Sequence, residues 1–258
     1  MSTVTLYDAF SEDYDRFVNW KARLEFEMPF FRALFDEYHV RRVLDSACGT
    51  GQHALAFARE GYEVTATDLS KPMIERAREN ALAAGLAVHF YVLGFGELAD
   101  ALPGLYDALT CLGNSLPHLT TEAALGAALQ DFARVLKPGG ILVIQNRNFD
   151  RVLAQQERFM PPEVYRAGDR EWIFMRFYDF EGELLRFNIV RLYRQGNSAW
   201  TSRIEHTQLR AWRAEALCGF IESTGFRIIK MLGSYRGEAF APSTSGDLVL
   251  IAKREVLK

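Results

Sequence analysis

The chain has 258 residues, of which 49% are hydrophobic and 24% are charged, so it is long enough for one sizeable globular α/β domain with an added lid. Its formal net charge is −3 and no basic block is present, which argues against a nucleic-acid partner. Cys48, Cys111 and Cys218 form no CxxC pair, and an odd number of cysteines argues against a disulfide scaffold or a zinc site. We therefore expect no metal.

The N-terminal residues are acidic and aromatic, unlike a signal peptide. No apolar run has the length needed to cross a bilayer. We expect a cytoplasmic location and no membrane partner.

Strands and helices alternate through the first part of the chain. Residues 1–38 form an amphipathic helical segment in this interpretation. Short apolar runs bounded by glycine turns then predict strands over 40–45, 63–68, 87–93, 106–112 and 141–145. Helical patterns lie between them, at about 53–59, 72–84 and 122–136, and a Lys-Pro-Gly-Gly turn follows the last. This alternation predicts a mostly parallel sheet with right-handed crossovers.

The alternation stops after residue 149. Stretches such as IFMRFYDF and LLRFNIVRLYR are typical of antiparallel strands. A helix at 214–223 and strands at 226–232 and 247–253 follow, and the last two predict a terminal antiparallel hairpin. We expect a Rossmann-like α/β fold with a seven-stranded sheet. Its parts are an N-terminal helical lid (1–38), a core (39–149 and 211–258) and a small antiparallel β cap (150–210).

The segment Val43-Leu44-Asp45-Ser46-Ala47-Cys48-Gly49-Thr50-Gly51-Gln52 joins a strand to a glycine turn, which lets a ligand approach the backbone closely. Asp68 ends the next strand, where a carboxylate can accept both hydroxyls of a ribose. The turn also satisfies the GxGxxA pattern of dinucleotide-binding proteins. Asp45 argues against that cofactor, because it would repel a pyrophosphate but attract the cations of S-adenosylmethionine. An ordinary turn without a cofactor is the remaining alternative.

The stretches VLDSACGTGQHALAFAREGYEVTATDLSKPMIERAREN and LKPGGILVI resemble the class I S-adenosylmethionine-dependent methyltransferases. The resemblance implies S-adenosylmethionine as cofactor and a seven-stranded class I methyltransferase sheet. It implies cofactor contacts from Ala47, Gly49, Gly51, Asp68, Leu69 and Met73. The third strand departs from the family pattern, because Phe95 stands where many members place an acid; it offers a flat face to the adenine or packs in the core. Asp45 and Leu112 complete the predicted cofactor site.

Two further motifs resemble those of glycine and glycine/sarcosine N-methyltransferases. They are Cys-Leu-Gly-Asn-Ser at 111–115, with His118 after it, and Arg147-Asn148-Phe149-Asp150. In that family an asparagine and an arginine hold the amino acid substrate by its carboxylate, which assigns these roles to Asn114 and Arg147. Alternatively, Asn114 caps a strand end and Arg147 pairs with Asp150 or another acid. His118 is a catalytic candidate or a structural hydrogen-bond partner.

Both the predicted lid and the predicted cap contain aromatic residues that could contact a ligand. Tyr7, Tyr14 and Trp20 are candidates for a lid, and Tyr165, Tyr178 and Tyr193 are candidates for the wall of an acceptor pocket. Packing in the core is the alternative for all of them. Arg23 stands where the glycine methyltransferases place an arginine that holds the carboxylate of the cofactor.

The sequence thus predicts a methyltransferase that acts on a small soluble molecule, with the amine of glycine or sarcosine as first candidate. The alternatives are an O- or N-methyltransferase of another metabolite, a non-catalytic cofactor-binding protein and a nicotinamide-dependent oxidoreductase. The direction of Arg147 discriminates between acceptors, because an arginine inside the pocket favours a carboxylate. A homo-oligomer is left open.

Overall fold

The computed structural model describes residues 3–255, apart from the side chains of residues 3–5, 9, 10 and 12. Its larger sheet has seven strands in the order β10-β11-β5-β4-β1-β2-β3. In chain order these are β1 (Arg42–Ser46), β2 (Glu63–Asp68), β3 (His89–Val92), β4 (Tyr106–Cys111), β5 (Leu136–Arg147), β10 (Phe226–Leu232) and β11 (Asp247–Arg254). The first five are parallel, and β11 runs antiparallel to both β5 and β10. The predicted Rossmann-like sheet and its terminal antiparallel hairpin are confirmed.

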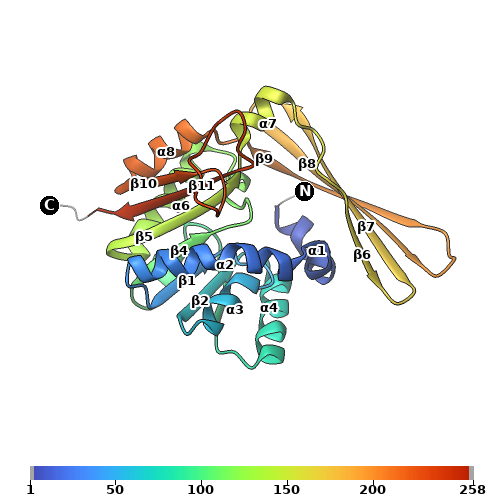
Figure 1. Ribbon diagram of the computed structural model, residues 1–258, viewed down its shortest axis with the longest axis horizontal. Helices are drawn as coiled ribbons and strands as arrows, with labels where there is room; N and C mark the ends of the chain where they lie inside the picture. Colours follow the sequence, from blue (N-terminus) through green and yellow to red (C-terminus); the bar gives the residue numbers. More distant parts are fainter. Residues whose placement is uncertain (1–2, 256–258) are drawn as a thin grey trace.

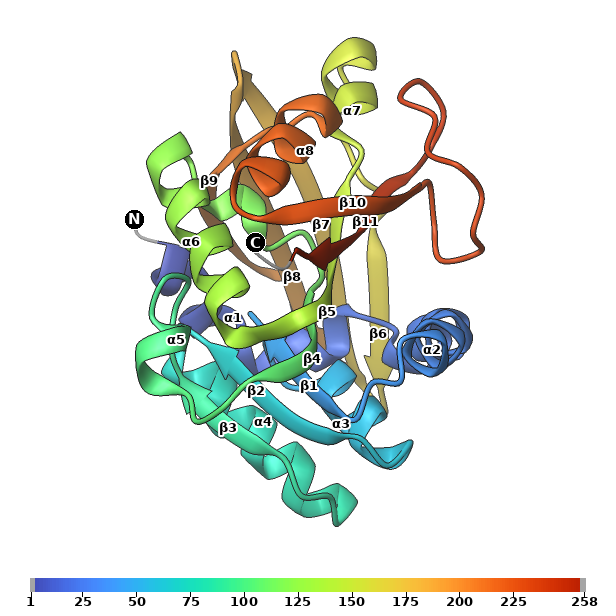
Figure 2. The same cartoon turned by 90° about the vertical axis from the view of Figure 1, so that its left-hand side faces the viewer.

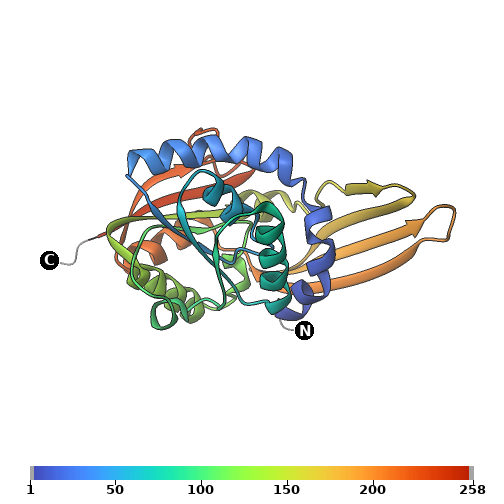
Figure 3. The same ribbon diagram turned by 90° about the horizontal axis from the view of Figure 1, so that it is seen from below.

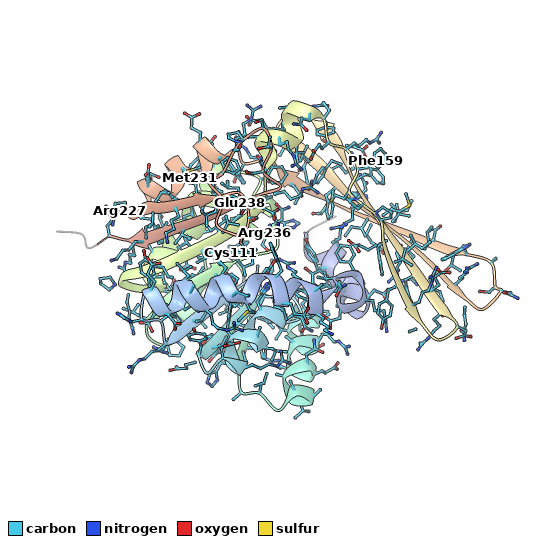
Figure 4. The ribbon with its side chains drawn as sticks, viewed as in Figure 1. Cys111, Phe159, Arg227, Met231, Arg236 and Glu238 are labelled. Atoms are coloured by element: carbon cyan, nitrogen blue, oxygen red, sulfur yellow. The ribbon has the colours of Figure 1, made fainter. Side chains whose placement is uncertain are left out.

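Helices cover both faces of this sheet because its strands are apolar on both sides. One face packs against α2 (Trp20–Glu37), α3 (Gln52–Arg59) and α4 (Lys71–Ala84), the other against α5 (Leu98–Ala101), α6 (Glu122–Val135) and α8 (Ala214–Ser223). Figures 1 and 2 show the two layers. The loop between β10 and β11 carries Arg236 and Glu238 back toward α2 (Figure 4), where the Arg236 guanidinium lies 5.4 Å from the ring centre of Phe26.

The second sheet is antiparallel, in the order β6-β7-β8-β9. Its strands are β6 (Glu163–Ala167), β7 (Arg170–Glu181), β8 (Leu184–Gln195) and β9 (Thr201–Arg210). It projects from the core as a long twisted ribbon, with α1 (Thr3–Phe17) lying across its base (Figures 1 and 3). The face toward α1 buries Trp172, Phe174 and Tyr178, whereas Met175 and Ile204 on the other face are 42% and 65% exposed.

Three local details differ from the sequence prediction. The N-terminal segment is two helices that break at Val18 and Asn19, where the Asn19 side chain accepts a hydrogen bond from the Ala22 N–H and starts α2. The predicted Lys-Pro-Gly-Gly turn lies within β5, and the register of the pairing between β4 and β5 shifts at this point. A short helix, α7 (Phe149–Gln155), opens the predicted cap and was missed; Asn148 caps it by accepting from the Arg151 N–H.

Among the described residues, no helix combines the length and apolarity that a membrane crossing requires. Among the side chains that the structure describes, His, Cys, Asp and Glu form no cluster of three or more that could hold a metal ion.

Candidate functional site

Two adjoining cavities open at the carboxyl ends of the parallel strands, where ligands bind in open α/β sheets. The smaller has a volume of about 170 Å³ and is lined from β1, β2 and the turns that follow β3 and β4. The larger, of about 500 Å³, extends past the end of β5 to the inner face of the second sheet. Tyr7, Tyr14, Gly113 and His118 line both. Two ligands bound in these cavities would therefore meet at these four residues.

The glycine turn and Asp68 form the polar wall of the smaller cavity. Ala47 and Gly49 adopt positive φ angles of 59° and 55°. The Gly49 N–H donates to Asp68 Oδ2 at 2.8 Å, and the Ser70 N–H donates to Oδ1 at 2.9 Å. Burial raises the pKa of Asp68. The carboxylate is thus held rigidly by the backbone, and its other lone pairs can accept the hydroxyls of a ligand.

Asp45 lies beneath this wall and does not line the cavity itself. Its Oδ1 accepts from the Thr110 hydroxyl at 2.8 Å, whereas its buried Oδ2 has no hydrogen-bond partner within residues 3–255. Burial raises the pKa of Asp45 to about 6. An uncompensated buried carboxylate is costly, so a cationic ligand nearby would stabilise its charged form.

The opposite end of the smaller cavity is apolar. Leu69, Met73, Leu93 and Phe95 line it. Phe95 also packs edge-on against Phe132 in the core at 5.8 Å between ring centres, so its two alternatives, cavity wall and core packing, coexist.

Several predicted residues lie outside both cavities. Gly51 is buried, and a Cβ there would come within 3.0 Å of Ala77 and Phe90, so its lack of a side chain serves packing between helices and sheet. Leu112 is 5% exposed in the core. Trp20 lies edge-on to His53, with 5.5 Å between the ring centres, and it lines neither cavity.

Asn114 and Arg147 meet at the border between β4 and β5 and both line the larger cavity. The Arg147 N–H donates to Asn114 Oδ1 at 2.9 Å, and the Asn114 N–H donates to the Gln145 carbonyl at 3.1 Å. Asn114 therefore also satisfies backbone groups at a strand end. These two hydrogen bonds fix the position of the Arg147 backbone at the end of β5, and with it the point from which its side chain extends.

The guanidinium of Arg147 faces the larger cavity and not Asp150, which accepts from the Ala214 N–H at 2.9 Å. Arg147 lies over the ring of Tyr178, 5.9 Å from its centre. The nearest carboxylate is that of Glu157, at 3.6 Å from Nη2. Arg147 thus lines the cavity and also pairs with another acid, Glu157, so both interpretations of this residue stay open.

His118 is positioned by the N-terminal helix. Its Nε2 lies 2.9 Å from the Tyr7 hydroxyl, and its buried Nδ1 has no partner in the described part of the chain. Burial lowers the pKa of His118 to about 4. The imidazole is therefore neutral at pH 7 and is a weak base.

Arg23 lines the larger cavity and not the smaller one. Its Nε donates to Glu27 Oε1 at 2.9 Å, and Glu27 Oε2 lies 2.5 Å from His53 Nε2. These buried hydrogen bonds hold Arg23 near Tyr14, which lines both cavities.

Of the three cap tyrosines, only Tyr178 lines the larger cavity; Tyr165 and Tyr193 stack on Trp172 instead. Sequence reasoning missed Arg176 and Asp247, which also line it. Arg176 carried a usable signal, because in IFMRFYDF it falls on the same face of the strand as Phe174 and Tyr178, which are buried.

Comparison with known proteins agrees with this geometry. Residues 43–140 match the family model described as a methyltransferase domain. The chain is 39% identical over 144 residues to the glycine/sarcosine N-methyltransferase of Parasynechococcus marenigrum. This alignment covers 56% of this chain and 51% of that protein. It thus spans about half the length of the curated relatives it matches.

Two solved structures match nearly the whole chain. An S-adenosylmethionine-dependent methyltransferase from Clostridium acetobutylicum superposes with a TM-score of 0.79 at 18% identity, over 97% of this chain and 99% of that one. The sugar N-methyltransferase KedS8 from Streptoalloteichus superposes with a TM-score of 0.75 at 20% identity, over 97% of this chain and 93% of that one. The matches favour the methyltransferase interpretation of the glycine turn over the dinucleotide-binding one. The predicted resemblance is confirmed: the chain has the fold of the S-adenosylmethionine-dependent methyltransferases and carries a methyltransferase domain over residues 43–140.

Proposed function

We propose that the protein uses S-adenosylmethionine to methylate the amine of a small amino acid, with glycine and sarcosine as first candidates. One observation carries the proposal: the Arg147 guanidinium faces a cavity that adjoins the cofactor cavity. The names of the sequence relatives, glycine/sarcosine N-methyltransferases, support it.

The smaller cavity fits the proposed cofactor. The orphaned Oδ2 of Asp45 and the raised pKa of this carboxyl call for a nearby cation. Asp68 would accept the ribose hydroxyls, and Leu69, Met73 and Phe95 would enclose the adenine. Ala47 and Gly49 supply the close backbone approach. When bound, S-adenosylmethionine supplies an electrophilic methyl group on a sulfonium.

On the acceptor side, Arg147 would hold the carboxylate through two parallel hydrogen bonds. Asn114 uses its Oδ1 on the backbone, which leaves its Nδ2 to orient the acceptor. Holding the amine in line with the methyl group can lower the barrier by roughly 7–11 kcal/mol, so a strong base is not required. Because the pKa of His118 is lowered to about 4, we assign this residue and Tyr7 to positioning, with the amine proton lost to water before attack.

We further propose the division into a lid (1–38), a core (39–149 and 211–258) and a cap (150–210), with Tyr7, Tyr14 and Arg23 closing the site from the lid. A cytoplasmic location and a small-molecule substrate without nucleic-acid or membrane partners remain part of the proposal, and a homo-oligomer is left open.

The second candidate is methylation of another metabolite. The acceptor cavity, about 500 Å³, falls within the roughly 300–1,000 Å³ typical of sites for drug-sized ligands, and glycine would fill little of it. A sugar N-methyltransferase also matches the chain across the cap.

The test is to measure cofactor affinity by calorimetry and then S-adenosylhomocysteine release with glycine, sarcosine and a panel of amines. We expect turnover on an amino acid that falls about 100-fold in Arg147→Ala, with cofactor affinity unchanged. Arg158→Ala, in an exposed pair with Asp179, is the matched control. Turnover only on amines without a carboxylate would favour the second candidate, and absence of cofactor binding would refute both.

A further inference from the structure

A second arginine faces the acceptor cavity from the other sheet. Arg147 ends β5, and Arg176 lies in the middle of β7. Both line the larger cavity, and both act electrostatically on Tyr178 between them. Arg176 shares the inner face of β7 with Trp172 and Phe174, which are 6% and 0% exposed. The side chain of Arg176 therefore points toward the interior of the protein, where a charged group is rarely found without a partner.

Neither guanidinium has a hydrogen-bond acceptor within the described residues. The nearest carboxylate oxygens, those of Glu157 and Glu163, each lie 3.6 Å away, and the Nε atoms of Arg147 and Arg176 are buried without a partner. The other two arginines of the cavity have hydrogen-bond acceptors for their guanidiniums, although Arg151 Nε is also buried without a hydrogen-bond partner among the described residues. Arg23 donates to Glu27 at 2.9 Å, and Arg151 donates to the Thr244 carbonyl at 3.0 Å.

The acids of the cavity do not supply the missing acceptors. Four arginines but only two acids, Glu27 and Asp247, line it. Glu27 is engaged by Arg23 and His53. Asp247 accepts a hydrogen bond from Gln145, and burial raises its pKa, although the charges of Arg147 and Arg23 oppose that rise; it forms no hydrogen bond with Arg147 among the described residues. Arg147 and Arg176 therefore have only long ion pairs, with Glu157 and Glu163, and anionic groups of a ligand at hydrogen-bond distance would stabilise them further.

We infer that Arg147 and Arg176 bind two separate anionic groups of one acceptor, so the substrate is an amine that carries two carboxylates, as in an acidic amino acid. This inference rests on the proposed function, N-methylation of an amino acid, and replaces its first candidates, glycine and sarcosine, by acidic amino acids. Glycine would satisfy Arg147 and leave Arg176 unpaired, whereas a cavity of about 500 Å³ has room for a dicarboxylate. The guanidinium of Arg176 lies 4.6 Å from the ring centre of Phe17, and that of Arg147 lies 5.9 Å from the ring centre of Tyr178.

The first experiment measures binding without requiring turnover. Succinate and glutarate are titrated by calorimetry into the protein saturated with S-adenosylhomocysteine, and each is compared with its monoamide, which has the same shape and one charge fewer. We expect the dianion to bind at least tenfold more tightly. Arg176→Gln should remove this preference, and so should Arg176→Met, whose apolar stem still packs on Phe17. The control Arg158→Gln removes a charge beside Phe159, which is labelled in Figure 4, lies between α7 and β6 and is 65% exposed; this variant should keep the preference.

The second experiment compares turnover of glutamate with glutamine and of aspartate with asparagine. We expect kcat/KM to favour the acidic member of each pair at least tenfold, and Arg176→Gln to abolish this ratio while leaving cofactor affinity unchanged. Equal binding of dianion and monoamide, or a preference that survives in both Arg176 variants, would overturn the inference. Glycine turnover in that case would leave the proposed function intact. A dianion preference without turnover of any amino acid would instead sustain the two-anion site and refute the proposed function.

Discussion

The two sheets of this protein contribute to one site in different ways. The parallel sheet is buried on both faces and offers its ligands mainly the turns at its strand ends, such as Ala47 to Gly49, with Asp68 held by two backbone N–H groups. The β6–β9 sheet is buried on one face only and offers side chains from the middle of its strands, such as Arg176 and Tyr178. Backbone turns suit a cofactor of constant shape, whereas alternating side chains can be exchanged without altering the fold, which suits a variable acceptor.

Helix α1 couples these two regions. Ser70 in the core donates its hydroxyl to Asp8 at 2.5 Å, and Thr50 donates to Asp15 at 2.6 Å. On its other side, Asp13 forms an ion pair with Arg191 of β8. A single helix, which also supplies Tyr7 and Tyr14, therefore contacts both regions and lines both cavities.

The largest effects on stability are expected from substitutions in the core of each sheet. Leu44 in β1 and Leu185 in β8 are both fully buried, and replacing either by alanine should lower the free energy of unfolding by about 2–5 kcal/mol. In urea titrations both variants should unfold earlier. Leu44→Ala should also weaken S-adenosylhomocysteine binding, whereas Leu185→Ala should leave it within about twofold. Equal weakening in both would show that the sheets do not act separately.

Asp68→Ala should reduce cofactor affinity about 100-fold, because it removes charged acceptors for two ligand hydroxyls, each worth roughly 1.5 kcal/mol. Calorimetry with S-adenosylhomocysteine measures the loss. Asp107→Ala is the control at the opposite end of the same sheet, where the carboxylate accepts from the Arg42 N–H at 2.8 Å and from Lys137 at 2.6 Å. That variant should lose stability but not affinity. A similar affinity loss in both variants would place the cofactor elsewhere.

Acidification should weaken cofactor binding through Asp45. Its pKa is raised by burial to about 6, so this carboxyl is charged at pH 7 and mostly protonated at pH 5. A protonated Asp45 no longer attracts a cation, and S-adenosylmethionine affinity should fall about tenfold over this range. The sign for stability is opposite: the folded protein binds this proton more tightly than the unfolded chain, so Asp45 favours folding more as pH falls from 6 toward 4. In Asp45→Asn both pH dependences should flatten; persistence of the affinity change would assign it to another group.

The smallest effect is expected at the surface between the two regions. Arg210 of β9 lies 3.3 Å from Glu122 of α6 and 3.1 Å from Glu183. The Glu122 side chain is 64% exposed, so Glu122→Gln should lower the free energy of unfolding by less than about 1 kcal/mol, and salt should erase the difference. A larger, salt-resistant loss would mean that this pair, and not only α1, joins the cap to the core.

Much of the core could be predicted from the sequence because its signals are local. The glycine turn, the strand-end Asp45 and Asp68, and the alternation of strands and helices depend on backbone requirements that a short segment expresses by itself. The motifs at Asn114 and Arg147 likewise lie at strand ends, and parallel strands bring their carboxyl ends together. Helix α7 was missed because its capping residue, Asn148, lies inside the motif that was interpreted as a binding segment.

The tertiary structure alone decided which side chains share a cavity. Gly51 and Leu112 have suitable positions in the sequence, yet packing places them in the core, whereas Arg176, 29 positions after Arg147, shares a cavity with it because the second sheet folds back over the strand ends. The raised pKa of Asp45 and the lowered pKa of His118 also arise from burial, which depends on contacts far apart in the chain. Local sequence thus determined the frame for the cofactor, and long-range packing determined the chemistry of the acceptor cavity.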